Sequence, residues 1–133
     1  MAGTGAPLAS YAAAMLQGVH HVSINVSDWE VAGRFYIDVL GLEPVERPDL
    51  GFPGHWLAMA DGRQLHLLQV DGWVPPKGQH FAFAVDDLDG TRASLTAQGV
   101  KVSEPSEIAG VCRQSFFKDP CGNLIEINER CPA

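Results

Sequence analysis

Hydrophobic and polar residues follow one period and then another along this chain, and each change of period marks a new element. Residues 19–26 alternate, which predicts a strand because successive strand side chains point to opposite sides. Asp28 then supplies a helix cap, and an apolar face predicts a helix over 29–40, ended by Gly41. The strands that follow contain the strongest short hairpin signal of the sequence, Asp61-Gly62. These strands are predicted over 42–47, 55–60 and 63–70.

A short, proline-containing linker at 75–78 separates this unit from a second unit with the same order of elements. Alternation predicts a strand over 79–85, and the change of period predicts a helix over about 88–98. The turn Asp119-Pro-Cys-Gly122 joins the last two strands. The strands that follow this helix are predicted over 100–103, 112–118 and 123–128.

Equivalent residues of the two units lie 59 or 60 positions apart, and four of them carry side chains that can coordinate a metal ion. His21 and His80 each open the first strand of a unit, whereas His66 and Glu126 lie on the last strand. Chance can supply one such match, but four coordinating side chains at four equivalent places are hard to dismiss. A repeat of this length indicates two units that bury their apolar faces together.

The alternation also places the candidate ligands on one particular face of each strand. His21 shares its face with Ser23, and His80 shares its face with Ala82. Glu126 lies opposite its two isoleucine neighbours. In all three strands the large apolar residues occupy the other face. We therefore expect a helix to cover the apolar face and a cavity to lie on the face that carries the candidate ligands.

Composition and charge narrow the class of protein. The 133 residues fit one globular domain, with 46% hydrophobic and 19% charged residues. The net charge is −7 and Lys and Arg do not cluster, which argues against nucleic acid and against an anionic membrane as the main partner. The three cysteines are odd in number, so a disulfide framework is not expected and a reducing compartment is favoured. We therefore expect the protein in the cytoplasm.

Three motifs in this order resemble those of the vicinal oxygen chelate superfamily. They are His-Val-Ser-Ile-Asn-Val-Ser-Asp at 21–28, Phe-Tyr-Ile-Asp-Val-Leu-Gly-Leu at 35–42 and Asp-Pro-Cys-Gly-Asn-Leu-Ile-Glu at 119–126. That superfamily includes glyoxalase I, methylmalonyl-CoA epimerase, extradiol dioxygenases, fosfomycin-modifying thiol transferases and bleomycin-binding proteins. The resemblance covers residues 18–129 and implies an α+β fold, in which two βαβββ modules form a half-barrel cavity around a metal ion.

The resemblance and the linker together predict how the chain is divided. Residues 1–17 form an N-terminal extension, which has no Lys or Arg and so lacks the charged start of a secretory signal. A single domain follows over 18–130, with module one at 18–72 and module two at 78–130. Because exposed sheet edges favour pairing, we expect a homodimer.

The resemblance makes His21, His66, His80 and Glu126 the ligands of one divalent metal ion. Three imidazoles and one carboxylate suit Zn, Ni, Co, Fe or Mn, and they leave positions for water or substrate. Glyoxalase I usually has a carboxylate or an amide in place of His66, so this ligand set is one imidazole richer. Glu126 is the only acid of the four, and it is the expected catalytic base because a ligating carboxylate can leave the ion to collect a proton.

The expected function is that of a divalent-metal-dependent lyase or isomerase of the glyoxalase type. Such an enzyme moves a proton on a small substrate with two adjacent oxygens, while the metal stabilises the enediolate that forms. One alternative is an extradiol-type ring-cleavage dioxygenase with redox-active iron or manganese. The other alternative is a metal-free protein that binds a small molecule such as a drug, although such a protein is not expected to keep all four ligands.

Weaker signals concern the walls of the cavity. Four cationic residues are candidates for binding an anionic group of the substrate, although a surface ion pair is the commoner role of each. They are Arg47, Arg63, Arg113 and Lys118. Four apolar residues are candidates for the cavity wall, although a core position is the commoner one. They are Phe52, Trp56, Met59 and Phe116.

Two histidines lie outside the repeated pattern of candidate ligands. His20 is expected to be exposed or structural, and His55 to lie at a pocket or on the surface.

Overall fold

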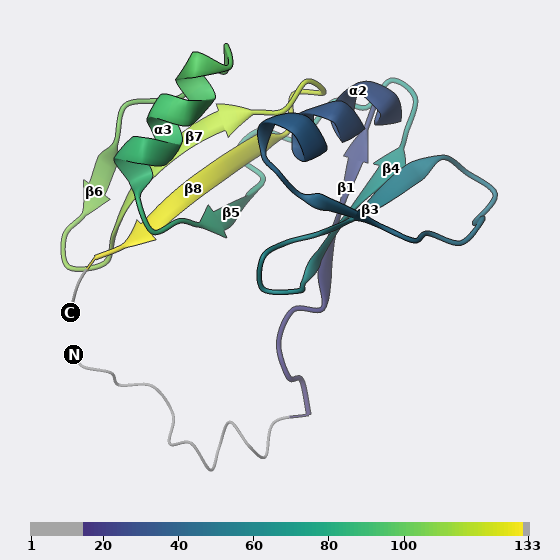
Figure 1. Ribbon diagram of the computed structural model, residues 1–133, viewed down its shortest axis with the longest axis horizontal. Coiled ribbons are helices and arrows are strands. Elements are labelled where there is room, and N and C mark those ends of the chain that lie inside the picture. The colour runs from purple at the N-terminus through teal and green to yellow at the C-terminus, as the bar shows by residue number, and fades with distance from the viewer. Residues whose placement is uncertain (1–14, 132–133) are drawn as a thin grey trace.

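The computed structural model describes residues 15–131 and contains two four-stranded sheets with one helical segment against each (Figure 1). This arrangement confirms the α+β fold of two βαβββ modules. Module one contains β1 (His21–Val26), α2 (Trp29–Arg34), η1 (Phe35–Val39), β2 (Glu43–Val45), β3 (Gly54–Ala58) and β4 (Gln64–Gln69). Module two contains β5 (His80–Ala84), α3 (Leu88–Ala97), β6 (Ser106–Ile108), β7 (Cys112–Lys118) and β8 (Leu124–Arg130). Most of the predicted extension 1–17 lies outside the described residues, and it stays a prediction.

Both sheets have the same topology. The strand order is β1-β4-β3-β2 in one sheet and β5-β8-β7-β6 in the other. In each sheet the first strand pairs with the last strand of the module in parallel, and all other pairs are antiparallel. His21 pairs with Gln64, and at the equivalent place His80 pairs with Leu124. The predicted repeat is therefore confirmed at the level of strand register.

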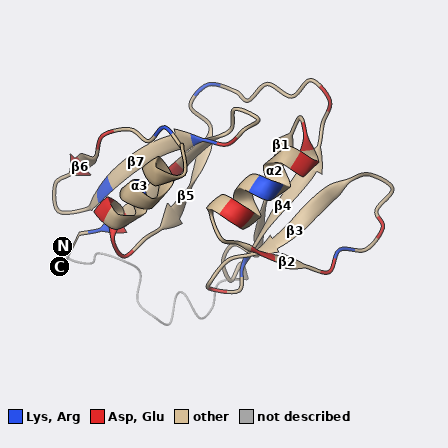
Figure 2. Ribbon diagram, turned by 45° about the horizontal axis from the view of Figure 1, so that its top comes forward, with Lys and Arg blue, Asp and Glu red and all other residues tan. Residues whose placement is uncertain are grey.

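Equivalent aspartates begin the two helices. Asp28 has an extended backbone, and its carboxylate accepts hydrogen bonds from the amides of Glu30 and Val31 at 3.1 Å each. Asp87 accepts a hydrogen bond from the amide of Gly90 at 2.9 Å. Asp28 is the N-cap that the sequence predicts, and Asp87 is the N-cap at the equivalent place in module two. A short acidic side chain suits this position because it satisfies amides that lack an intrahelical partner. Acidic and basic residues then follow along α2, as Figure 2 shows. None of the helices in residues 15–131 is long and apolar enough to cross a membrane.

The helix predicted over 29–40 forms, but its second half is wider than an α-helix. Residues 35–39 adopt a π-helix, in which the amide of Leu40 donates to the carbonyl of Phe35 at 3.1 Å. Gly41 then ends the helix with a φ of 79°, a left-handed conformation that glycine adopts without a steric penalty. Tyr36 lies in this π-helix, and its side chain is fully buried.

The prediction of a strand over 100–103 is wrong. The strand at this place in the fold is β6, Ser106–Ile108. Residues 100–103 do alternate between half-buried and exposed, as a strand would. However, they run beside β7 with a single backbone hydrogen bond, from the amide of Ser103 to the carbonyl of Phe116 at 2.9 Å. A strand needs a ladder of such bonds, which β7 makes with β6.

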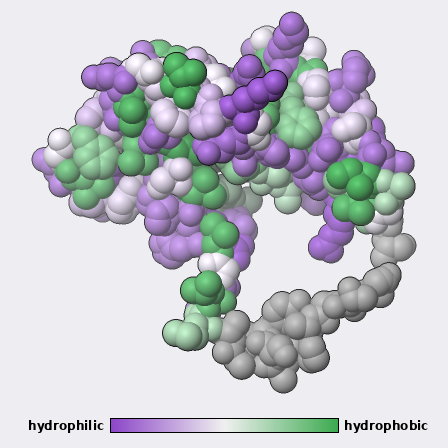
Figure 3. Space-filling model, turned by 180° about the vertical axis from the view of Figure 1, so that it is seen from behind, coloured by the Kyte–Doolittle hydropathy of each residue, from purple (hydrophilic) through white to green (hydrophobic). Residues whose placement is uncertain are grey.

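One apolar core joins the two modules. It contains residues from the helix-facing side of both sheets, among them Leu57, Leu65 and Leu67 of module one and Phe117, Ile125 and Ile127 of module two. Because strand side chains alternate, the opposite faces, which carry the candidate ligands, both point away from this core. The described part of the chain also starts with exposed apolar side chains, which lie next to the grey atoms in the view from behind (Figure 3). These side chains are Met15, Leu16 and Val19.

Candidate metal centre

Module one brings two of the predicted ligands together as stacked imidazole rings. His21 lies on β1 and His66 on the neighbouring strand β4, with ring centroids 4.1 Å apart and an interplanar angle of 18°. Trp56, directly across from His66 on β3, stacks on His66 with a centroid distance of 4.5 Å. Because β4 lies between β1 and β3, His66 is held between these two rings and is only 8% exposed.

The surroundings of His66 favour its neutral form. Burial lowers the pKa of His66 below the usual histidine value, and the nearby His21, His20 and Arg47 lower it further. Its Nε2 lies 2.9 Å from Oε1 of Gln64, which fixes the plane of the ring. A neutral imidazole is the form that binds a metal ion. His66 is therefore both oriented and in the protonation state that a ligand requires.

Module two brings the other two predicted ligands together as a hydrogen-bonded pair. His80 lies on β5 and Glu126 on the neighbouring strand β8, with Nε2 of His80 3.0 Å from Oε1 of Glu126. Glu126 is only 7% exposed, and its Oε2 accepts a hydrogen bond from Nδ2 of Asn128 at 2.7 Å. Phe116 of β7, directly across from Glu126, packs edge-on against His80 with a centroid distance of 5.3 Å. Phe116 thus occupies in module two the place that Trp56 occupies in module one.

The geometry of the His80–Glu126 pair fits a metal ion. Both ring nitrogens of His80 face oxygens, since Nδ1 lies 2.9 Å from the carbonyl of Gly78 and Nε2 lies beside the carboxylate. A neutral ring carries one N–H, so the second contact needs either an additional proton or a cation between Nε2 and the carboxylate. Two ligand atoms bound to one ion at about 2.1 Å and roughly a right angle lie about 3 Å apart, which matches the observed separation.

The four predicted ligands meet as two pairs. Within residues 15–131 of one chain, no group of three or more His, Cys, Asp or Glu side chains is placed to hold a metal ion. The reason is the shared core, from which the two ligand-bearing faces point outward. A centre built from His21, His66, His80 and Glu126 therefore requires module one of one chain to meet module two of another, and it stays a prediction.

Sequence reasoning missed a buried hydrogen-bond network that links the modules. The carboxylate of Asp119, 4% exposed, accepts hydrogen bonds from the hydroxyl of Tyr36 at 2.7 Å and from the amides of Cys121 and Asn123 at 2.8 and 2.9 Å. The side chain of Asn123 also donates to Asp119, at 2.9 Å, and to the carbonyl of Asn25 in β1, at 2.8 Å. The turn before β8, the strand that carries Glu126, is thereby anchored to module one.

The only sequence signal for this network is the motif Asp119-Pro-Cys-Gly-Asn123, which predicted the turn but not its partners. The turn itself is confirmed, with the amide of Gly122 donating to the carbonyl of Asp119 at 3.0 Å. Burial raises the pKa of Tyr36 well above its usual value, and the charge of Asp119 and the hydrogen bond to it raise it further. Tyr36 therefore stays protonated as a donor in the folded protein.

Most of the weaker candidates have partners within the chain. Arg63 pairs with Asp61 at 3.0 Å and Arg113 with Asp89 at 3.0 Å, so both form surface ion pairs. Arg47 donates to the carbonyl of Phe52 at 2.9 Å.

The two histidines outside the pattern have different surroundings. Nδ1 of His20 lies 3.0 Å from Nδ1 of His21, and His20 is exposed. His55 packs against Trp29 of α2, with ring centroids 5.0 Å apart, and burial lowers its pKa. A side chain on Gly33 would collide with the His55 ring, so this glycine lets the helix lie close to β3.

Sequence comparison with known proteins identifies a protein family and two relatives that match most of the chain. The model of the Glyoxalase/Bleomycin resistance protein/Dioxygenase superfamily matches residues 18–127. The protein YaeR of Escherichia coli (strain K12) is 29% identical over 129 residues, which cover 86% of this chain and 98% of YaeR. Lactoylglutathione lyase of Haemophilus influenzae is 29% identical over 121 residues, which cover 82% of this chain and 90% of the lyase.

Among solved structures, TnmS3, an antibiotic binding protein from Streptomyces sp. CB03234, superimposes with a TM-score of 0.73. It is 30% identical in sequence, and the match covers 89% of this chain and 99% of TnmS3. The chain is thus similar both to a protein named for an enzyme activity and to a protein named for binding a small molecule.

Proposed function

We propose that this chain, which belongs to the Glyoxalase/Bleomycin resistance protein/Dioxygenase superfamily, is a divalent-metal-dependent lyase or isomerase. Its substrate is a small molecule with two adjacent oxygens, such as a 2-oxoaldehyde thiol adduct. The observation that carries the proposal is the pair of His80 and the buried Glu126, in which a ring nitrogen and a carboxylate oxygen face each other at 3.0 Å. Similarity to lactoylglutathione lyase over 82% of the chain supports it.

The metal ligands in this proposal are His21, His66, His80 and Glu126. The first two come from one copy of the chain and the last two from a second copy, so the functional unit is a homodimer. The outward-facing pairs of one chain support this arrangement, as do the exposed apolar side chains of Met15, Leu16 and Val19. The ion would be Zn, Ni, Co, Fe or Mn, according to the donor set.

A divalent ion held by these four residues would supply a Lewis acid for the substrate oxygens. The chain supplies the base. Glu126 is the only carboxylate among the four ligands, and its Oε1 takes a proton from the substrate carbon next to those oxygens. Asn128 holds Oε2 at 2.7 Å and so limits the positions that Oε1 can adopt. Trp56 and Phe116 each pack against an imidazole ring and so limit the orientations of His66 and His80.

The test of the shared centre is to mix two variants that are each defective in one module. His21→Ala with His66→Ala removes the module one pair, and His80→Ala with Glu126→Gln removes the module two pair. Each variant alone is expected to bind no metal. Two different affinity tags allow mixed dimers to be isolated after joint refolding. Mixed dimers are expected to contain one ion each by elemental analysis, because one of their two sites then has all four ligands.

The matched control replaces a histidine outside the site, His55→Ala, and it is expected to keep the metal content of the unchanged protein. Mixed dimers without metal, or a monomer at micromolar concentration in sedimentation, would overturn the shared centre.

For the reaction, Glu126→Gln is expected to slow solvent-proton exchange at the substrate carbon by about 10²- to 10⁴-fold. Oxygen uptake on catechols with bound iron, and no proton exchange, would replace this reaction with that of a dioxygenase.

We also place the protein in the cytoplasm. The support is that Cys112, Cys121 and Cys131 are all free thiols, which are typical of proteins in a reducing compartment.

A further inference from the structure

A cavity of about 700 Å³ lies beside the module two pair, at the place where the two modules meet. Its walls come from η1 of module one, from residues 98–103 and from the ends of β7 and β8. The side chain of Gln98 closes part of the wall between the modules, since its Nε2 donates to the carbonyl of Val39 at 3.5 Å. A volume of this size accepts a small organic molecule, since ligand pockets typically have about 300–1,000 Å³.

The cavity adjoins the candidate metal centre through two of its lining residues. Phe116 lines the cavity and also packs against the His80 ring. Leu124 lines it as well and lies directly across from His80 in the parallel pair of β5 and β8. A molecule whose reacting end lies at His80 and Glu126 can therefore extend over Phe116 into the cavity.

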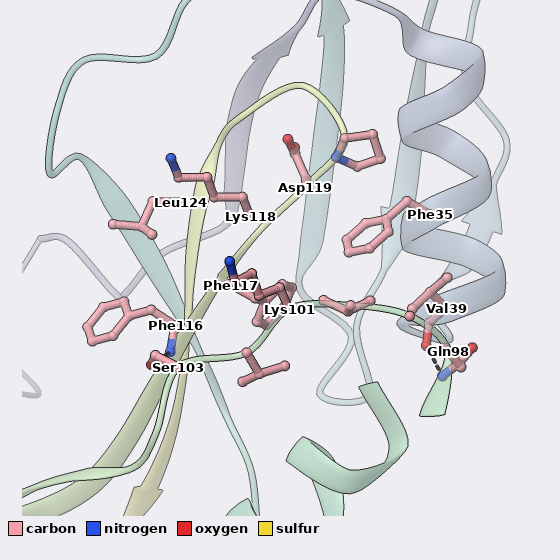
Figure 4. Close-up of a pocket in the computed structure, with 14 residues that line it drawn as sticks. Phe35, Val39, Gln98, Lys101, Ser103, Phe116, Phe117, Lys118, Asp119 and Leu124 are labelled. Carbon is pink, nitrogen blue, oxygen red and sulfur yellow. Dashed lines mark hydrogen bonds between the residues drawn. The ribbon is translucent and has the colours of Figure 1, made fainter. Parts of the chain in front are cut away.

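Most of the cavity wall is apolar, but two ammonium groups stand in it. Figure 4 shows Lys118 on β7 and Lys101 on the segment that crosses it, with Phe116 and Leu124 on one side of the lysines and Phe35 and Val39 on the other. Both lysines are exposed, and within residues 15–131 neither takes part in a salt bridge.

One acidic residue lines the cavity, and it does not neutralise these lysines by a direct contact. Asp119 is buried, and its two carboxylate oxygens accept hydrogen bonds from Tyr36 and from the turn that contains Asn123. The local charge of the cavity is therefore positive, although the whole chain has a net charge of −7. A local cationic site of this kind in an acidic protein selects an anionic group.

We infer that the cavity binds the far end of the substrate, and that this end is an apolar body with an attached anionic group such as a carboxylate. The apolar body lies on Phe35, Phe116 and Val102, and the anion lies between Lys101 and Lys118. The inference rests on the proposed function for the statement that the ligand is the substrate. The binding preference itself does not depend on the metal.

The test uses two fluorescent probes with the same ring system. One is 1-anilinonaphthalene-8-sulfonate, which is anionic, and the other is N-phenyl-1-naphthylamine, which is neutral. Replacing both cavity lysines, Lys101→Met with Lys118→Met, is expected to weaken binding of the anionic probe about fivefold, because two exposed ion pairs are lost. Binding of the neutral probe is expected to stay the same. The difference between the probes is also expected to shrink as the salt concentration rises.

Two further variants make the result specific. Lys77→Met with Arg130→Met removes the same charge from exposed residues outside the cavity, and it is expected to leave both probes bound as before. Val102→Trp fills the cavity and is expected to weaken both probes. The inference is overturned if the cavity lysines do not affect the anionic probe, if the control weakens it equally, or if Val102→Trp affects neither probe.

The same titration separates this inference from the proposed function. The variant His80→Ala with Glu126→Gln, which is expected to lack metal, should still bind the anionic probe. If it does so while mixed dimers contain no metal, the proposed function fails and the cavity preference remains. If mixed dimers contain metal but the cavity lysines have no effect on the probe, only the inference about the cavity fails.

Discussion

The ligand pairs of the two modules occupy equivalent strands but differ in chemistry. In module one, His21 and His66 are stacked imidazoles without an acidic partner between them. In module two, His80 faces the buried carboxylate of Glu126. At the repeat position of His66, module two has Glu126. In the proposed centre the two roles would differ, because a ring nitrogen bound to metal cannot take a proton, whereas a ligating carboxylate can leave the ion and do so.

The turns before the last strand of each module also differ, in the burial of their aspartate. In module one, Asp61 is exposed and pairs with Arg63 at the surface. In module two, Asp119 is buried and accepts hydrogen bonds from Tyr36 of η1 and from Asn123, whose side chain also donates to the carbonyl of Asn25 in β1. The turn before β8, the strand that carries Glu126, is therefore held by buried hydrogen bonds, whereas the turn of module one is held by a surface ion pair.

The largest effect is expected from removing the buried carboxylate, with Asp119→Ala. This change leaves the hydroxyl of Tyr36 and the amides of Cys121 and Asn123 without their acceptor in a buried place. We expect the free energy of unfolding to fall by about 3 kcal/mol or more, because buried donors without partners keep their full desolvation cost. Urea unfolding followed by circular dichroism measures it.

The matched control for this change is Asp61→Ala in the turn of module one. Its carboxylate is exposed, and the Arg63 side chain remains in water when the partner is lost. We expect the midpoint of urea unfolding to stay where it is. If the two substitutions shifted the midpoint equally, the two turns would not differ in the way that their burial indicates.

The second-largest effect, on metal affinity, is expected from removing the side-chain amides that contact the predicted ligands Glu126 and His66. Asn128 donates to Glu126 at 2.7 Å, and Gln64 lies 2.9 Å from His66. Asn128→Ala is expected to lower metal affinity by about 10- to 100-fold, which is typical for loss of a hydrogen bond to a ligand. Gln64→Ala is expected to cost less, because its bond joins two neutral groups rather than a neutral group and an anion. Competition with a chelating dye measures both affinities, and a larger loss for Gln64→Ala would reverse the comparison.

Much of the fold could be predicted from the sequence because the two units repeat each other. Alternation identified β1, β5 and β8 and the faces on which His21, His80 and Glu126 lie. The cap at Asp28 indicated the start of the first helix, because capping depends on neighbouring residues alone. These features are local, and so local patterns predict them.

The features that the sequence did not predict depend on contacts between distant segments. Residues 100–103 alternate like a strand, but whether they join the sheet depends on how β7 is already paired. The role of Asp119 depends on Tyr36, which lies 83 positions earlier in the chain. In the proposed centre, the four predicted ligands would meet only through a second chain. Spacing could indicate which residues are candidate ligands, but it could not show that one chain presents them as two separate pairs.

The smallest effect is expected from the other end of the Asp119 network, with Tyr36→Phe. At pH 8 we expect this change to lower the free energy of unfolding by about 1 kcal/mol, because one buried hydrogen bond is lost.

The pH dependence of this difference in unfolding free energy is the sharper test. Folding raises the pKa of Tyr36, mainly by burial, so its contribution to stability is complete below the unfolded value of about 10 and declines above it. Each pH unit above 10 should remove about 1.4 kcal/mol. The difference between Tyr36→Phe and the unchanged protein should therefore vanish or change sign near pH 11 in urea unfolding. A difference that stays constant from pH 8 to 11 would show that the Tyr36 hydroxyl is not held protonated by the buried surroundings of Asp119.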